Sequence, residues 1–132
     1  MIDITFKSDR FNLSVVGADF TNDCCFGEDL SEWLVAHLPA AGIEADIICM
    51  EDFGWANLAV YRGASYLMCV SGNSDEDPTR PDQGEWHVML ERQRGFLDKL
   101  LGRNRIDVSD PIVAKISEAL RDADFEGVTV NA

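Results

Sequence analysis

Three apolar runs in the middle of the chain, separated by short connections, constrain its fold more than any other feature. The runs cover residues 43–50, 55–61 and 65–71, and they are rich in β-branched, aromatic and other apolar side chains. The connections, residues 52–54 and 62–64, each contain a glycine, as short turns between antiparallel strands often do. We therefore predict a three-stranded antiparallel meander.

Further strands are predicted on both sides of this meander. Residues 2–6 and 11–15 alternate apolar and polar side chains, which is the period expected of strands with one buried face. They form a hairpin or one long bent strand. Residues 86–90 form another predicted strand after a polar loop, and residues 125–130 return as a short edge strand.

Two segments before the last part of the chain show helical spacing of apolar residues. The first begins at Glu28 with acidic residues in its first turns, which favour the positive end of a helix. Pro39 kinks or ends this helix, and Gly42 can adopt the left-handed conformation that closes it. The second predicted helix covers residues 96–101 and stops at Gly102.

A final helix is predicted from Pro111 to about residue 123, with Asp110 as its N-cap. Together these elements predict an α+β fold: a mostly antiparallel sheet of about five strands with two to three helices on one face. The length of 132 residues suits one domain, residues 1–132, and a hydrophobic content of 46% can fill its core.

The charge of the chain excludes most surfaces that would bind phosphate backbones. Eleven Lys and Arg against 24 Asp and Glu give a net charge of −13, which makes direct binding of nucleic acid unfavourable. No stretch approaches the roughly 18 apolar residues that span a bilayer, and the opening residues lack a basic and then apolar leader. We expect a cytoplasmic protein without membrane contact.

The sequence indicates neither a metal site nor a bound cofactor. His37 and His87 have no paired ligand, no Cys-x-x-Cys motif is present, and the usual phosphate-cradling and serine-hydrolase motifs are missing. The four cysteines are expected to be reduced thiols. Cys49 and Cys69 lie in predicted strands, where a free cysteine behaves as a small buried hydrophobic residue.

Positive and negative charges are sorted along the chain. Residues 11–61 contain no Lys or Arg but nine Asp and Glu, whereas residues 92–105 carry five basic residues and one acid. One interpretation is that acidity only keeps the protein soluble. The other is that the acidic region presents a face complementary to a basic partner, because such fields steer association.

Two motifs support a resemblance to a group of small proteins. Phe26-Gly27-Glu28-Asp29-Leu30 followed by Trp33-Leu34, and then Glu51-Asp52-Phe53-Gly54-Trp55, resemble a pattern in small, uncharacterised bacterial proteins, in which a GEDL-x-x-WL helix precedes an ED-[FW]-GW strand entry. The resemblance extends through residues 86–88 and 100–103. It implies a bacterial cytosolic domain and supplies no catalytic residues. In size and charge the chain is also similar to immunity proteins that neutralise basic toxins.

The favoured interpretation is an acidic, non-catalytic binding protein that docks on a basic protein partner, as an immunity-like inhibitor of a bacterial toxin or nuclease would. The residues predicted to bind this partner are Glu28, Asp29, Glu32, Glu51, Asp52 and Trp55. Trp55 has two alternative roles, an interface anchor or a core residue.

Two other functions remain open from the sequence. A small enzyme or ligand-binding domain would use Glu51, Asp52 and His87, provided that the fold brings them around one pocket. An acidic mimic of nucleic acid would block a DNA-binding enzyme, and it requires carboxylates spaced like phosphates along an extended surface.

Overall fold

The computed structural model describes residues 1–11, 26–51, 54–74 and 83–132, and it confirms the α+β fold. The strands are β1 (Ile2–Ser8), β2 (Glu44–Glu51), β3 (Gly54–Tyr61), β4 (Ala64–Ser74), β5 (Gly84–Arg92) and β6 (Glu126–Asn131). The helices are α1 (Glu28–His37), the 3-10 helix η1 (Leu38–Ala41), α2 (Phe96–Leu101) and α3 (Pro111–Asp122). The predicted strand over residues 11–15 lies almost wholly outside the described residues.

All six strands form one antiparallel sheet in the order β2-β3-β4-β5-β1-β6. The predicted meander is confirmed as β2, β3 and β4. The first strand inserts between β5 and β6, so that Ile4 lies opposite both Val88 and Val130. The sheet therefore has six strands where about five were expected, and the sixth is the predicted short edge strand at the end of the sequence.

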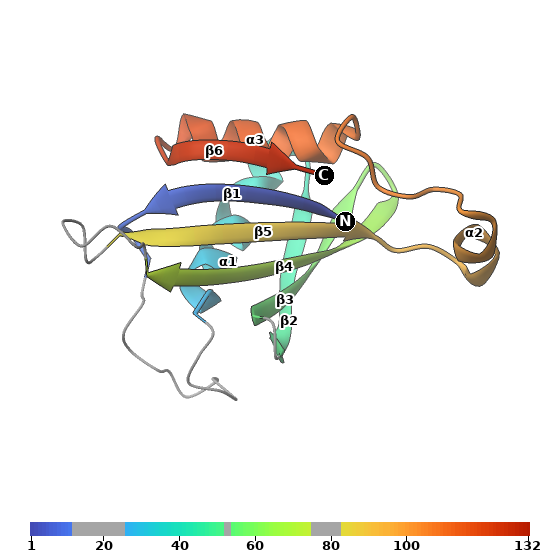
Figure 1. Ribbon diagram of the computed structural model, residues 1–132, viewed down its shortest axis with the longest axis horizontal. Coiled ribbons are helices and arrows are strands. Elements are labelled where there is room, and N and C mark those ends of the chain that lie inside the picture. Colours follow the sequence, from blue (N-terminus) through green and yellow to red (C-terminus); the bar gives the residue numbers. More distant parts are fainter. Residues whose placement is uncertain (12–25, 52–53, 75–82) are drawn as a thin grey trace.

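The helices α1 and α3 pack on the same face of the sheet, as expected, and the core lies between them and the strands (Figure 1). Leu30 and Leu34 of α1 and Ile116 and Leu120 of α3 are fully buried against side chains such as Trp86. Among the described elements, no helix covers the opposite face of the sheet, which we call the open face.

The helix α1 ends where Pro39 and Gly42 predict its end. Pro39 lies in η1, because the chain tightens from an α-helix to a 3-10 helix where proline cannot donate a hydrogen bond. Gly42 then adopts a left-handed conformation with φ of 83°, and its backbone N–H donates to the carbonyl of Pro39 at 3.0 Å. The chain reverses here into β2.

The start of α3 differs in one detail from the prediction. Pro111 occupies the first turn, but the side chain of Asp110 makes no capping hydrogen bond to the helix. Its carboxylate instead accepts a hydrogen bond from the backbone N–H of Asp107 at 2.9 Å. Asp110 therefore stabilises the loop before the helix rather than the first turn of the helix.

Residues 93–110 form an arm that extends beyond the end of the sheet and carries α2 (Figure 1). None of the residues of α2 is buried, although the helix was predicted from its apolar spacing. It ends at Gly102, which has the left-handed conformation expected of a helix-closing glycine, with φ of 67°.

Candidate functional site

The start of α1 and the start of β3 meet on the same part of β4. The backbone N–H of Gly72 donates to the carbonyl of Phe26 at 3.1 Å, which fixes the chain two residues before α1 beside β4. A Cβ on Gly27 would lie 3.0 Å from the carbonyl oxygen of Val70, and a Cβ on Gly54 would overlap that same oxygen. Glycine at both positions therefore allows α1 and β3 to approach β4 closely.

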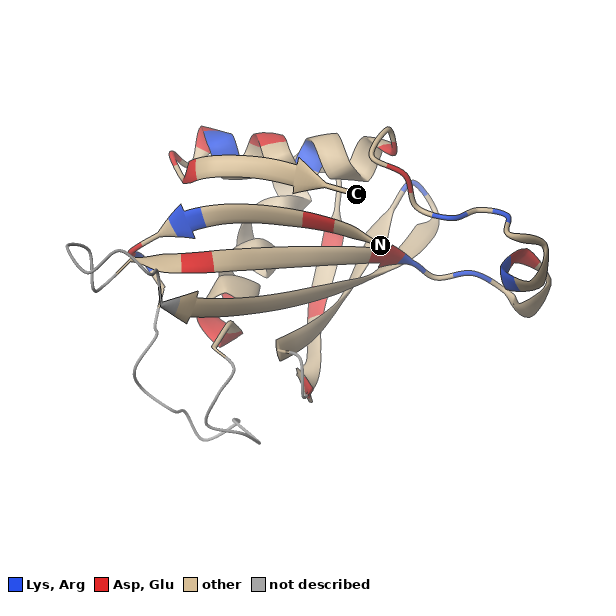
Figure 2. Ribbon diagram, in the orientation of Figure 1, with Lys and Arg blue, Asp and Glu red and all other residues tan. Residues whose placement is uncertain are grey.

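This packing places the predicted acidic residues at one end of the molecule, which we call the acidic end (Glu28, Asp29, Glu32 and Glu51). Glu28 and Asp29 form the first turn of α1, and Glu51 pairs in register with Gly54 at the tip of the β2–β3 hairpin. Figure 2 shows the acidic start of α1 and the acidic end of β2 in the same lower part of the view. Asp52 lies outside the described residues.

Exposure differs among these carboxylates. Glu32 and Glu51 are exposed, whereas Glu28 and Asp29 are half-buried at the helix start. Asp29 accepts a hydrogen bond from the backbone N–H of Leu30 at 3.0 Å. Glu32 and Glu51 are therefore the most accessible charges of the acidic end.

Trp55 occupies the core rather than the surface. Only 3% of its surface is exposed, and its ring lies beside the position that a Cβ on Gly27 would take. The neighbouring Asn57 is also buried and donates a hydrogen bond to Ser31 Oγ at 3.0 Å, which joins β3 to α1. The structure thus fits the alternative in which Trp55 is a core residue, since a buried indole cannot anchor a partner without moving.

Two exposed apolar residues near the acidic end were missed by the sequence reasoning. Ile48 is 55% exposed and Ile47 is 36% exposed on β2, which is an edge strand. A bulge between Ile47 and Cys49 interrupts the register with β3, so the alternation of buried and exposed residues breaks down. The sequence shows only a continuous apolar run, which is also the pattern of a buried strand.

The fold does not bring Glu51 and His87, the two described residues of the proposed enzyme site, around one pocket. His87 of β5 pairs with Ser71 of β4, while Glu51 lies on β2 beyond β3. Three strand spacings of about 4.8 Å separate the two side chains, roughly 14 Å along the sheet. His87 instead contacts Asp3 Oδ2 at 3.0 Å and Glu85 Oε1 at 3.7 Å.

The two described cysteines are less buried than expected. Cys49 is exposed and Cys69 is half-buried on the open face, because the bulge in β2 turns Cys49 outward and no described helix covers Cys69. Cys49 Sγ donates a hydrogen bond to Glu51 Oε1 at 3.2 Å, and this bond raises the pKa of the thiol. Burial raises the pKa of Cys69, with a smaller contribution from the charge of Glu51.

Within the described residues, no group of three or more His, Cys, Asp and Glu side chains is arranged to hold a metal ion. No described helix is long and apolar enough to cross a membrane. Comparisons with known protein families, curated proteins and solved structures give no match.

Proposed function

We propose that this chain is a non-catalytic binding protein that docks its acidic end on a basic protein surface. An immunity-like inhibitor of a bacterial toxin or nuclease is the kind of protein that this proposal describes. The observation that carries it is the meeting of α1 and the β2–β3 hairpin on β4, which gathers acids that are distant in the sequence. The stretch of sequence that supplies these acids, residues 11–61, contains no Lys or Arg.

The apolar part of this interface is assigned to Ile48 rather than to Trp55. Stable protein interfaces combine an apolar centre with a charged rim, and most affinity comes from a few desolvated anchors. Ile48 is exposed on the same strand that ends at Glu51, so it can lose its contact with water when a partner docks. Trp55 supports the surface from below by filling the core.

The alternative functions have weaker support. An enzyme that pairs Glu51 with His87 would need side chains separated by three strand spacings to act on one substrate. A mimic of nucleic acid would need carboxylates along an extended surface, whereas the four carboxylates of the acidic end lie close to one another at one end of the molecule.

A comparative capture experiment tests the proposal. Wild-type protein and the variant Glu28→Lys/Asp29→Lys/Glu32→Lys are immobilised side by side, and proteins retained from bacterial extract are quantified by mass spectrometry. The proposal expects a basic protein in equimolar amount on the wild type and its loss on the variant.

A matched control variant distinguishes the effect of the acidic end from the effect of the net charge of the protein. Reversal of Glu118, Asp122 and Asp124, which are exposed at the end of α3 and just after it, changes the net charge equally. This control variant should retain the partner. Equal capture by all three proteins, or capture of no basic protein by the wild type, would contradict the proposal.

A further inference from the structure

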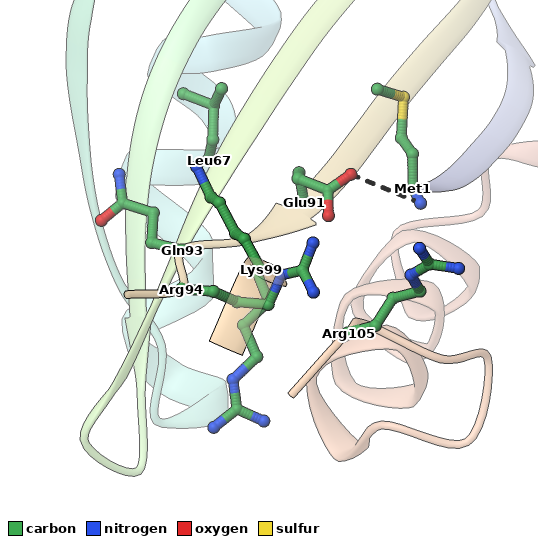
Figure 3. Close-up of a pocket in the computed structure, with 8 residues that line it drawn as sticks. Met1, Leu67, Glu91, Gln93, Arg94, Lys99 and Arg105 are labelled. Atoms are coloured by element: carbon green, nitrogen blue, oxygen red, sulfur yellow. Dashed lines mark ion pairs between the residues drawn. The ribbon is translucent and has the colours of Figure 1, made fainter. Parts of the chain in front are cut away.

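We propose that a second site lies where the arm meets the end of β5 and binds phosphate groups through Arg92, Arg94, Lys99 and Arg105. These residues line an opening of about 780 Å³ between the arm and the adjoining end of the sheet. The volume lies within the range of roughly 300–1,000 Å³ that small-molecule sites occupy. Figure 3 shows the cationic side chains around this opening, next to Glu91 and Met1.

Glu91, which lines the opening, and Asp98 of α2 both have ion-pair partners. Glu91 Oε2 forms an ion pair with the amino group of Met1 at 3.4 Å, and Asp98 forms one with Arg103 at 3.6 Å. In the part of the chain that the structure describes, no carboxylate forms an ion pair with any of the four lining cations. Among the described residues, four cations therefore line this opening together with one carboxylate, that of Glu91, which is paired with the amino group of Met1.

Arg94 is held in place but incompletely bonded. Its Nη1 donates to the carbonyl of Arg103 at 3.1 Å, which joins the two sides of the arm across α2. Its Nε is buried and has no hydrogen-bond acceptor among the described residues. Leaving a buried charged donor unsatisfied is costly, so an anionic acceptor at this position would be stabilised.

Phosphate matches this group of side chains better than a single carboxylate does. Guanidinium groups present several N–H donors in a plane and bind phosphate oxygens in pairs, while the lysine adds a point charge. The acids elsewhere in the molecule do not prevent binding. At physiological ionic strength charges are screened over a Debye length of about 8 Å, so the four neighbouring cations dominate the local field.

The surroundings of the site allow two sources of phosphate. One is a soluble polyphosphate compound, and the other is the headgroup of an anionic lipid. The exposed apolar surface of α2 supports the second source. The side chains beside the cations that are between 61% and 79% exposed are Phe96, Leu97, Leu100 and Leu101. Apolar residues next to basic ones are typical of segments that lie in a membrane interface.

Calorimetry with sodium tripolyphosphate and sedimentation with vesicles test the two sources. The vesicles contain phosphatidylcholine with or without phosphatidylglycerol. We expect binding to one of these probes, weakened at least tenfold by Arg92→Gln/Arg105→Gln and weakened by added salt. If the natural ligand is a soluble polyphosphate, the variant Leu97→Gln/Leu101→Gln should bind tripolyphosphate as tightly as the wild type does. If it is a lipid headgroup, this variant should bind the phosphatidylglycerol vesicles more weakly than the wild type does.

The control variant Arg62→Gln/Arg121→Gln removes two exposed arginines that lie outside the opening, and it should bind like the wild type. Circular dichroism confirms that each variant remains folded. Absence of binding to both probes would overturn the proposal. So would binding that both double arginine variants weaken equally, because it would reflect overall charge instead of a site.

Discussion

At the residue scale, the close contact between Gly72 and Trp86 holds the strands beneath the acidic end. Gly72 lies opposite Trp86 across β4 and β5, and the indole ring occupies the space where a side chain on Gly72 would begin. Trp86 is fully buried, so its ring cannot swing into solvent. Gly72 also pairs with Phe26, which positions the start of α1.

We predict that Gly72→Ala lowers the free energy of unfolding by roughly 1–3 kcal/mol, because the added methyl group overpacks the core. Urea denaturation followed by Trp fluorescence measures the effect. Gly95→Ala is the control, since a Cβ there meets no atom within 4 Å. An unchanged midpoint for Gly72→Ala would show that the indole does not occupy this space.

The thiol of Cys49 provides a second prediction at this scale. Its pKa is raised mainly by its hydrogen bond to Glu51, so less of the reactive thiolate is present near neutral pH. Cys49 should therefore react with iodoacetamide more slowly in the folded protein than in the denatured chain. As the pH rises, its alkylation rate should reach half its maximum above the usual thiol pKa.

Glu51→Gln removes the charge that favours the protonated thiol, so alkylation of Cys49 should accelerate. Peptide mass spectrometry resolves Cys49 from the other cysteines and gives its rate in each variant. A Glu51→Gln rate equal to the wild-type rate over the whole pH range would show that the two side chains do not interact.

At the element scale, α1 and α2 differ in the burial of their apolar side chains. Leu30 and Leu34 of α1 are fully buried, whereas Leu100 of α2 is 68% exposed. We predict that Leu30→Ala costs about 2–5 kcal/mol of stability through loss of burial and formation of a cavity. The matched substitution Leu100→Ala should change stability by less than about 0.5 kcal/mol.

Denaturant titrations of both variants check this contrast. A large loss of stability for Leu100→Ala would mean that α2 is buried in solution, in this molecule or against another copy. The arm would then not be the exposed segment that the phosphate site requires.

The elements themselves were predictable because their signals are local. The alternation of apolar and polar residues predicted β1, and the glycines of the short connections separated β2, β3 and β4. Pro39 and Gly42 marked the end of α1. The exposure of α2 was not predictable, since helical spacing does not reveal whether the apolar residues have a surface of the molecule to pack against. The bulge in β2 and the exposure of Ile48 also depend on pairing that local sequence does not encode.

Which residues make up the candidate site could be established only from the whole fold. The sequence groups the residues of the acidic end by charge alone, and the glycines at positions 27 and 54 explain how they come together. The separation of Glu51 from His87 follows from strand order, which the sequence did not specify. The sequence shows the cations of residues 92–105 as a run, but it does not show their arrangement around one opening.

At the scale of the whole molecule, two regions differ most in charge. The acidic end lies where α1 meets the β2–β3 hairpin, and the basic residues gather on the arm beyond β5 (Figure 2). A basic partner approaching from solution should therefore be oriented by the field before contact. Such steering acts on association, whereas dissociation depends on apolar anchors.

The salt dependence of association with the captured basic partner tests the central proposal most directly. Stopped-flow rates are compared for the wild type, the acidic-end reversal of Glu28, Asp29 and Glu32 to Lys, and the control reversal of Glu118, Asp122 and Asp124 to Lys. We predict that the acidic-end reversal slows association about tenfold or more at low salt and far less at high salt, with a smaller effect of the control. Equal association rates for the wild type and the acidic-end reversal at every salt concentration would contradict docking through the acidic end.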